Sequence, residues 1–186
     1  MSRDQELWRD ARTLNELGEL TARWLEGTNS YLPASTPDDD GAVRPDTETG
    51  PLVPCLARAN RHGYLTTFSQ PGEPLTDGCG QRATVEGFCT EETASRIQDA
   101  YLGTDLVVIA TPPASENPTQ IPVTIDDGKA FTCAGSALDA ANIRHFYGGD
   151  CPHALAALLA AWQLTVIDPR WGRTGLLWQK LDLAWS

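Results

Sequence analysis

Two neighbouring segments near the middle of the chain alternate apolar and polar residues and predict adjacent strands. Residues 64–68 and 81–89 carry aromatic and β-branched side chains, which suit a half-buried, pleated surface. Between them, Pro71 fixes φ and Gly72 permits a positive φ, so this pair favours a turn compatible with type II geometry. We therefore expect an antiparallel pair of strands joined by a long, glycine-bearing loop.

Apolar residues repeat at helical spacing on both sides of this pair. Thr13 and Glu16 have the spacing of a capping box, in which each side chain satisfies a free backbone donor near the other. Leucine and tryptophan then fall on one stripe up to Leu25, and Gly27 ends the helix. Further helices are expected over residues 51–63, 90–103, 136–147 and 152–162, and in a short segment after residue 172.

Other short apolar runs predict strands over residues 105–110, 120–125, 130–133 and 164–167. Between the second and third runs, Asp127-Gly128 supplies the positive φ angles of a tight hairpin. Hairpins mixed with helices predict an α+β fold, with a mostly antiparallel sheet of about five to six strands packed with helices. We expect a single domain over residues 1–186, with a mobile surface loop at residues 28–50.

Acidic residues outnumber basic ones by 25 to 14, which gives a formal net charge of −11 at pH 7. This charge argues against nucleic-acid binding, which needs a basic surface, and could attract a basic protein partner. No run approaches the roughly 20 apolar residues that a membrane helix requires. The charged first ten residues lack the apolar core of a signal peptide. We therefore expect a cytoplasmic protein whose five cysteines are small, mostly buried thiols.

Polar side chains stand at both ends of the loop that joins the central strands. In an antiparallel pair they would meet at one end of the sheet, where a guanidinium could bind a carboxylate or phosphate. The sequence thus predicts a pocket for an anionic or amide-bearing small molecule. Its predicted ligand-binding residues are Ser69, Gln70, Gly72, Gln81 and Arg82. In the alternative, structural interpretation, Ser69 and Gln70 cap the turn and Arg82 pairs with a nearby glutamate at the surface.

Two carboxylates near this pocket are candidates for acid–base chemistry. Glu86 lies on the second central strand, and Glu48 precedes the helix that leads into the first. A carboxylate close to Arg82 could act as a general acid or base, or could form a structural ion pair. We name Glu48 and Glu86 as the predicted catalytic residues and leave both interpretations open.

We expect no metal and no cofactor. His145, Cys151 and His153 lie close together in the sequence, but Cys-Pro-His lacks the usual ligand gap and no second cluster completes a tetrahedron. Cys79 lies in a glycine-flanked loop near Arg82, where a lowered pKa could make it a nucleophile. It would need a base, and the sequence pairs none with it.

Several segments together carry a resemblance to a known family. They are RTLNELGELTARWLEG at residues 12–27, TETGPLVPCLARANRHGYLTTFSQPGE at 47–73, QRATVEGFCTEE at 81–92 and AAWQLTVIDPRWGRTGLLWQKL at 160–181. With these segments the chain resembles an uncharacterised family, a domain of unknown function, of small acidic proteins in actinobacteria. The resemblance implies no activity. It implies that the segments flanking the central loop belong to one domain.

Two functional hypotheses follow. The first is a small-molecule-binding domain, with or without catalysis, whose polar pocket lies at the end of the central sheet. The alternative is an acidic protein-binding module, of the inhibitor or immunity type, that engages a basic partner. A concave pocket lined by residues 69, 70, 81 and 82 would favour the first, and a flat acidic face with exposed aromatic side chains would favour the second.

Overall fold

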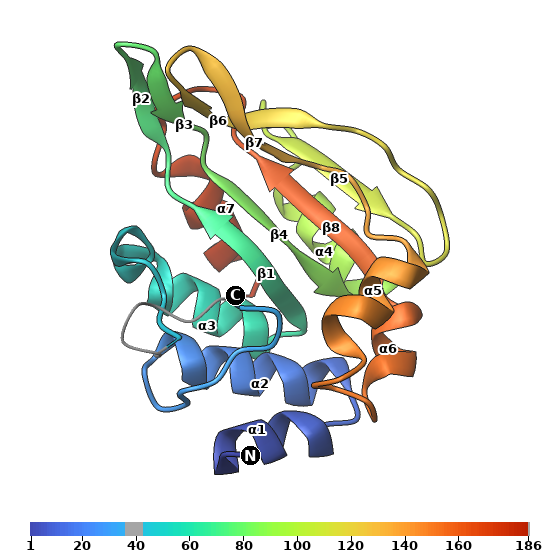
Figure 1. The fold of residues 1–186 in the computed structure, drawn as a ribbon. Helices are drawn as coiled ribbons and strands as arrows, with labels where there is room; N and C mark the ends of the chain where they lie inside the picture. The colour runs from blue at the N-terminus through green and yellow to red at the C-terminus, as the bar shows by residue number, and fades with distance from the viewer. Residues whose placement is uncertain (36–42, 186) are drawn as a thin grey trace.

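A computed structural model describes residues 1–35 and 43–185 of the chain. Its fold is α+β, as predicted, but its strands form two antiparallel sheets of four strands each instead of one sheet of five to six. The core sheet has the order β1 (Tyr64–Gln70), β4 (Thr84–Cys89), β8 (Trp162–Ile167), β5 (Val107–Thr111). The distal sheet has the order β2 (Glu73–Thr76), β3 (Cys79–Gln81), β6 (Ile121–Asp126), β7 (Lys129–Ala134). Figure 1 shows the distal sheet extending away from the N-terminal helices.

Helices cover both faces of the core sheet. They are α1 (Arg3–Asp10), α2 (Leu14–Leu25), α3 (Val53–Arg61), α4 (Glu91–Ala100), α5 (Ala140–Tyr147), α6 (Leu155–Leu159) and α7 (Leu176–Leu183), with a 3-10 helix η1 (Thr47–Leu52). Buried side chains of α3, α4 and α7 pack around Tyr64 and Val85 on one face. Those of α1, α2, α5 and α6 pack around Leu65 and Phe88 on the other. Among the described helices, none is long and apolar enough to cross a membrane.

The helix starts expected at Thr13 and Thr90 are confirmed, whereas two other starts were missed or misplaced. The Thr13 and Glu16 capping box is present, and Gly27 follows α2 with a φ of 74°. Helix α1, which the sequence analysis did not predict, begins with a similar box between Ser2 and Gln5. Helix α5 is capped by Asp139, three residues beyond the expected start. These starts follow the side chain that accepts the free backbone N–H, not the first apolar residue.

The expected helix over residues 152–162 is wrong over most of its length. Helix α6 has five residues, because the chain enters strand β8 at Trp162. Trp162 pairs with Cys89 of β4, which lies more than 70 residues earlier in the sequence. The long-range pairing outweighs the local helix propensity of the alanine- and leucine-rich run.

The long loop expected between the central strands is in fact a hairpin. Strands β2 and β3 pair antiparallel across a turn at Asp77 and Gly78, whose φ angles are 52° and 83°. The predicted turn at Asp127-Gly128 is confirmed, with φ angles of 47° and 72°. The two hairpin tips are joined, because the Gly128 amide donates to the Gly78 carbonyl at 2.8 Å.

The expected mobile loop at residues 28–50 is only partly within the described residues, since positions 36–42 lie outside them. The parts on either side are anchored by indole N–H groups. Trp8 donates to the carbonyl of Tyr31 at 2.9 Å, and Trp24 donates to that of Val43 at 2.9 Å. Helix η1 then occupies residues 47–52. The prediction of one domain over the whole chain is untested and stays a prediction.

Strands β1 and β4 approach closely at an irregular point of their ladder. Thr66 pairs with Gly87 and Phe68 with Glu86, so Thr67 is the extra residue of a β-bulge. A Cβ placed on Gly87 would lie 2.2 Å from the carbonyl oxygen of Leu65. Only glycine fits opposite the bulge, because any side chain there would force the strands apart.

We predict that Gly87→Ala lowers the free energy of unfolding by about 3 kcal/mol, since the added methyl group overlaps the β1 backbone. Urea denaturation followed by tryptophan fluorescence measures the change. Gly149→Ala is the matched control, because a Cβ there would meet nothing within 4 Å. Equal stability of the two variants would show that the strands can separate without cost.

Candidate functional site

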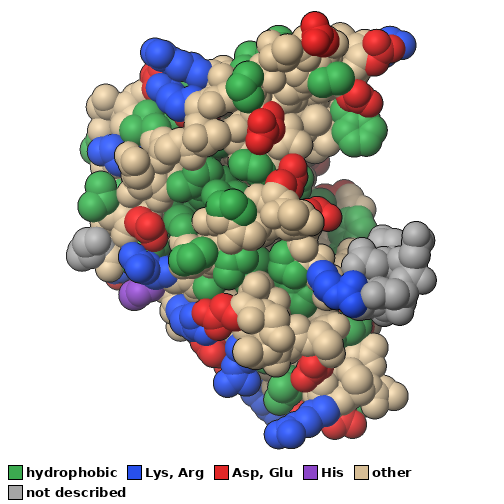
Figure 2. Space-filling view, turned by 90° about the vertical axis from the view of Figure 1, so that its left-hand side faces the viewer, with side chains coloured by type: hydrophobic (Ala, Val, Ile, Leu, Met, Phe, Trp, Pro, Cys, Tyr) green, Lys and Arg blue, Asp and Glu red, His purple; other side chains and the backbone are tan. Residues whose placement is uncertain are grey.

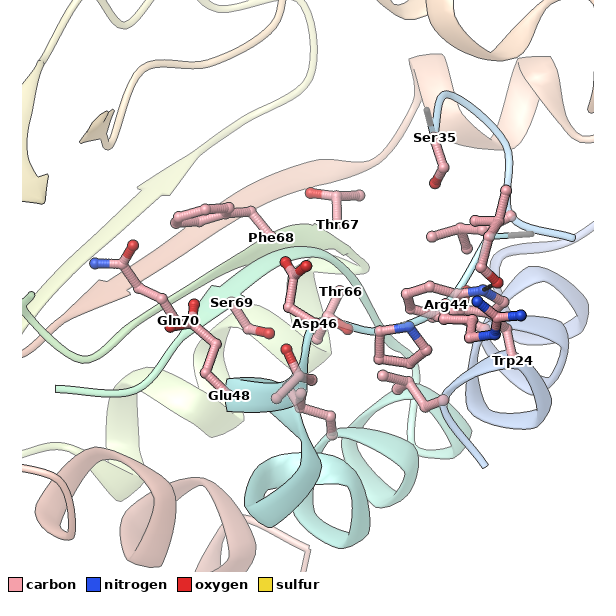
Figure 3. Close-up of a pocket in the computed structure, with 17 residues that line it drawn as sticks. Trp24, Ser35, Arg44, Asp46, Glu48, Thr66, Thr67, Phe68, Ser69 and Gln70 are labelled. Atoms are coloured by element: carbon pink, nitrogen blue, oxygen red, sulfur yellow. Dashed lines mark hydrogen bonds between the residues drawn. The ribbon is translucent and has the colours of Figure 1, made fainter. Parts of the chain in front are cut away.

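A polar cavity of about 330 Å³ lies between strand β1, helix α2 and the segment that leads into η1. Figure 3 shows the side chains that line it. Residues 66–70 of β1 form one wall, and residues 43–49 form another. The cavity therefore lies beside the β-bulge, at the position where the ladder between β1 and β4 is irregular. Bulges are frequent next to functional sites because they change the direction of side chains.

The Thr66 hydroxyl is held in place by a buried amide. Asn60 of α3 is fully buried; its Nδ2 donates to Thr66 Oγ1 at 2.7 Å, and its Oδ1 accepts the Thr66 backbone N–H at 3.0 Å. Asn60 itself lies in tight contact with α2, since a Cβ on Gly18 would be 2.3 Å from the Asn60 carbonyl oxygen. Because the Thr66 oxygen accepts from Asn60, its hydroxyl hydrogen can donate to a bound molecule.

Two carboxylates come from the opposite wall. Asp46 immediately precedes η1 and Glu48 lies in its first turn, and both side chains are exposed. In Figure 3 they extend toward β1 on the two sides of Ser69, whose hydroxyl lies between them in this view. Nε2 of Gln81 donates to Oε2 of Glu48 at 3.4 Å, a long bond that a ligand group could replace. The cavity thus presents carboxylate and hydroxyl oxygens together.

Aromatic side chains complete the lining. Trp24 of α2 and Phe68 of β1 are both partly buried at the cavity. The indole of Trp24 fixes the segment that carries the carboxylates through its bond to Val43. Phe68 also packs against Val123 and Ile167, where the two sheets meet. The cavity therefore has apolar surface for a ligand's carbon skeleton beside its polar groups.

Gln70 joins the two sheets. Its side chain is 4% exposed; Nε2 donates to the carbonyls of Arg82 and Val123, both at 2.9 Å, and Oε1 accepts the Thr124 hydroxyl. All three bonds are internal, and Figure 3 shows the amide turned away from Ser69. The amide is therefore occupied by the fold instead of facing the cavity.

Arg82 is likewise held by the protein. Its Nη1 donates to the carbonyl of Pro122 at 2.8 Å, and its guanidinium lies 4.3 Å from the ring centre of Trp171. It does not line the cavity that contains Ser69. The expected single recess made by Ser69, Gln70, Gln81 and Arg82 is therefore not formed: Gln81 belongs to the distal sheet, which the sequence analysis did not predict, and neither Gln81 nor Arg82 lines the cavity.

Gly72 serves a close backbone contact. A Cβ there would lie 2.8 Å from the carbonyl oxygen of Arg173, and its φ is not positive, so the expected type II turn is wrong. Of the predicted site residues, Glu48, Ser69 and Gln70 line the cavity, although the Gln70 amide bonds within the protein, and the Gln81 amide lies beside Glu48. Their role toward a ligand stays a prediction.

If Gln70 serves the fold, its substitution will lower stability. We predict that Gln70→Glu, which keeps the size but replaces the donor with an oxygen facing two carbonyls, costs about 3 kcal/mol at neutral pH. Urea denaturation measures this cost, and Gln98→Glu at an exposed position of α4 is the control. A Gln70→Glu protein as stable as the control would mean that the amide does not hold the sheets together.

Glu86 lies on β4 in a different environment. Its Oε1 accepts the Gly135 N–H and the Thr165 hydroxyl, each at 2.8 Å. It lines a separate cavity of about 150 Å³ with Thr67 and Gln163. Burial raises the pKa of the Glu86 carboxyl above its ordinary value of 4.5, and the two hydrogen bonds oppose this only in part. Because Glu86 and Glu48 line different cavities, they are not brought together as a catalytic pair.

The raised pKa of Glu86 predicts a pH dependence of stability. Above pH 4.5 the unfolded chain loses this proton first, so stability falls as pH rises through the folded-state pKa. Glu86→Gln cannot ionise and its amide oxygen can accept the same two bonds. We therefore expect its unfolding free energy to fall less than that of the wild type between pH 4 and 8.

Urea denaturation across this pH range tests the effect. Glu116→Gln, at an exposed loop position, controls for the loss of one negative charge. If Glu86→Gln and Glu116→Gln change with pH in the same way, the burial of Glu86 has no effect on its ionisation.

The cysteine and metal-site candidates from the sequence lie outside the cavity. Cys151 is fully buried, where burial raises its thiol pKa to about 12. Within residues 1–35 and 43–185, no three His, Cys, Asp or Glu side chains are grouped so that they could hold a metal ion. Cys79 is exposed, and its Sγ donates to Asp126 at 3.4 Å.

Sequence reasoning missed Trp24, Asp46, Thr66 and Thr67 as cavity residues. Asp46 stands two positions before Glu48, and this short acidic spacing ahead of η1 was the one signal available. The bulge at Thr67 depends on the register with β4, which the residues of β1 alone do not reveal.

No protein of curated function matches this chain. A family model described as a domain of unknown function, DUF6919, matches residues 3–185. That range includes the cavity, both sheets and every described helix. The chain therefore belongs to the DUF6919 family.

Proposed function

We propose that this protein binds a small, polar molecule bearing an amino group in the cavity beside β1. The observation that carries the proposal is the pair of carboxylates, Asp46 and Glu48, placed with the Ser69 hydroxyl around one cavity. Its volume of about 330 Å³ is at the lower end of the range for small-molecule sites. A ligand ammonium group would receive charge-assisted hydrogen bonds from both carboxylates.

The charge of the site favours a cationic group over the anionic one that the sequence suggested. Arg82, the cation expected to bind an anion, is engaged by Pro122 and Trp171 instead. The chain as a whole carries a formal net charge of −11, which also favours the approach of a cation. Arg44 lines another part of the cavity, away from Asp46 and Glu48.

The remaining polar groups would set the ligand's orientation. Thr66, held by Asn60, is a donor with a fixed position, and Ser69 can donate or accept. Trp24 supplies apolar surface beside them. In this proposal Glu48 keeps the acid–base role suggested by the sequence. Its carboxylate accepts the long hydrogen bond from Gln81, which a ligand group could replace.

We also propose that the protein acts in the cytoplasm. All five cysteines are free thiols, and Cys79 and Cys133 are exposed. Exposed thiols without disulfide partners persist in a reducing compartment.

A thermal-shift screen tests the binding proposal. Amino-bearing, neutral and purely anionic metabolites would be compared. At a ligand concentration of about 100 times the dissociation constant, binding to the folded state adds about 2.7 kcal/mol to the free energy of unfolding. This raises the melting temperature of a chain of this size by roughly 5–10 °C. We expect amino-bearing compounds to give this shift, and Asp46→Asn with Glu48→Gln to abolish it.

The double variant Glu91→Gln with Glu116→Gln is the matched control, because it removes two exposed charges outside the cavity. Ser69→Ala should weaken binding about tenfold by removing one hydrogen bond to a charged group. Hits that stabilise the cavity double variant as much as the wild type, or a screen in which only anions bind, would refute the proposal.

A further inference from the structure

A second hollow lies on the outer surface of the distal sheet. Its volume is about 450 Å³, and it is separate from the β1 cavity. Phe131 of β7 lines it and is 77% exposed, compared with 41% for Phe146, another exposed phenylalanine. An aromatic ring at a rigid sheet surface has a solvation cost that binding would relieve. This makes Phe131 a candidate contact residue.

Two carboxylates line the same hollow as the Phe131 ring. Glu73 of β2 and Asp126 of β6 line the same hollow, and both are exposed. Asp126 accepts a long contact from the thiol of Cys79, at 3.4 Å. The hollow therefore combines an exposed aromatic face with two negative charges, which complement a positively charged, planar group.

We propose that this hollow binds an arginine side chain from a basic partner protein. A guanidinium can lie flat on an aromatic ring while its edge donates to carboxylates, and a lysine ammonium cannot do both equally well. The protein already contains one such stack, where Arg82 covers Trp171 at 4.3 Å. A protein partner fits better than a small molecule because Phe131 projects from an open surface, where an exposed aromatic anchor is typical of protein interfaces.

The hollow is held in shape before any partner arrives. The turns of the two hairpins are joined by the bond from the Gly128 amide to the Gly78 carbonyl. Gly80 lies so close to β2 that a Cβ would be 2.7 Å from Leu75 Cα. A surface that need not reorganise loses less entropy when it binds.

A peptide titration tests the proposal. The probe is an acetylated and amidated Gly-Arg-Gly-Arg-Gly peptide, and its control contains citrulline in place of arginine, which keeps the shape and removes the charge. We expect saturable shifts in the ¹H–¹⁵N spectrum confined to amides of β2, β3, β6 and β7. The arginine peptide should bind at least tenfold more tightly than the citrulline peptide, and its affinity should fall at high salt.

Two pairs of variants locate the contact. Phe131→Ala should weaken binding about threefold to fivefold, whereas Leu102→Ala, at a position 73% exposed, should have no effect. Glu73→Gln with Asp126→Asn should weaken binding about tenfold, and Glu91→Gln with Glu116→Gln should not. None of these residues lines the β1 cavity, so the outcome is independent of the proposed small-molecule site.

Three results would overturn the proposal. The first is the absence of saturable shifts up to about 10 mM peptide, which would exclude a dissociation constant near 1 mM. The second is equal binding of the arginine and citrulline peptides. The third is a concentration-dependent dimer that Phe131→Ala abolishes, which would assign the hollow to a second copy of the chain.

Discussion

The buried amide of Gln70 is the interaction on which the arrangement of the two sheets depends. It ends β1 in the core sheet, yet its three hydrogen bonds reach Arg82, Val123 and Thr124, the last two in β6 of the distal sheet. A buried amide without these partners would be unfavourable, so the chain must leave the core sheet at this point in one orientation. A backbone hydrogen bond from the Arg82 N–H to the Val123 carbonyl also joins β6 to the chain where it returns from β3 to β4.

This junction also determines where the β1 cavity can form. With Gln70 held from one side and Thr66 held by Asn60 from the other, the bulged residues between them have fixed positions. The acidic segment before η1 is then brought against them by the indole of Trp24. The cavity is a consequence of two anchored ends and one extra residue, and its polar groups are preorganised for the same reason.

Local signals made much of the fold predictable, and non-local pairing accounts for what was missed. The Thr13–Glu16 box and Asp127-Gly128 act within a few residues, so their sequence alone identifies them. The β2–β3 hairpin carried the same Asp-Gly signal at residues 77–78, but short, exposed strands hid it. For the site, the sequence identified Gln70 and Arg82 as polar residues near the end of the central strands. It could not identify their hydrogen-bond partners, Val123 and Pro122, which lie 53 and 40 residues away in the chain.

Several acidic side chains are paired with arginines, and Figure 2 shows basic and acidic side chains next to each other on the face that it views. Arg61 pairs with Glu19 and Glu26, and Arg173 pairs with Asp105 and the fully buried Asp168. Arginines that hold helices and loops together in this way neutralise the acidic residues beside them and leave others, such as Glu48 and Glu73, on open surfaces. A chain with an excess of acidic residues thus keeps exposed carboxylates that attract cations. A ligand amino group and an arginine of a partner protein are both cations that complement carboxylates. The amino group suits a concave cavity, and the arginine suits an exposed aromatic ring.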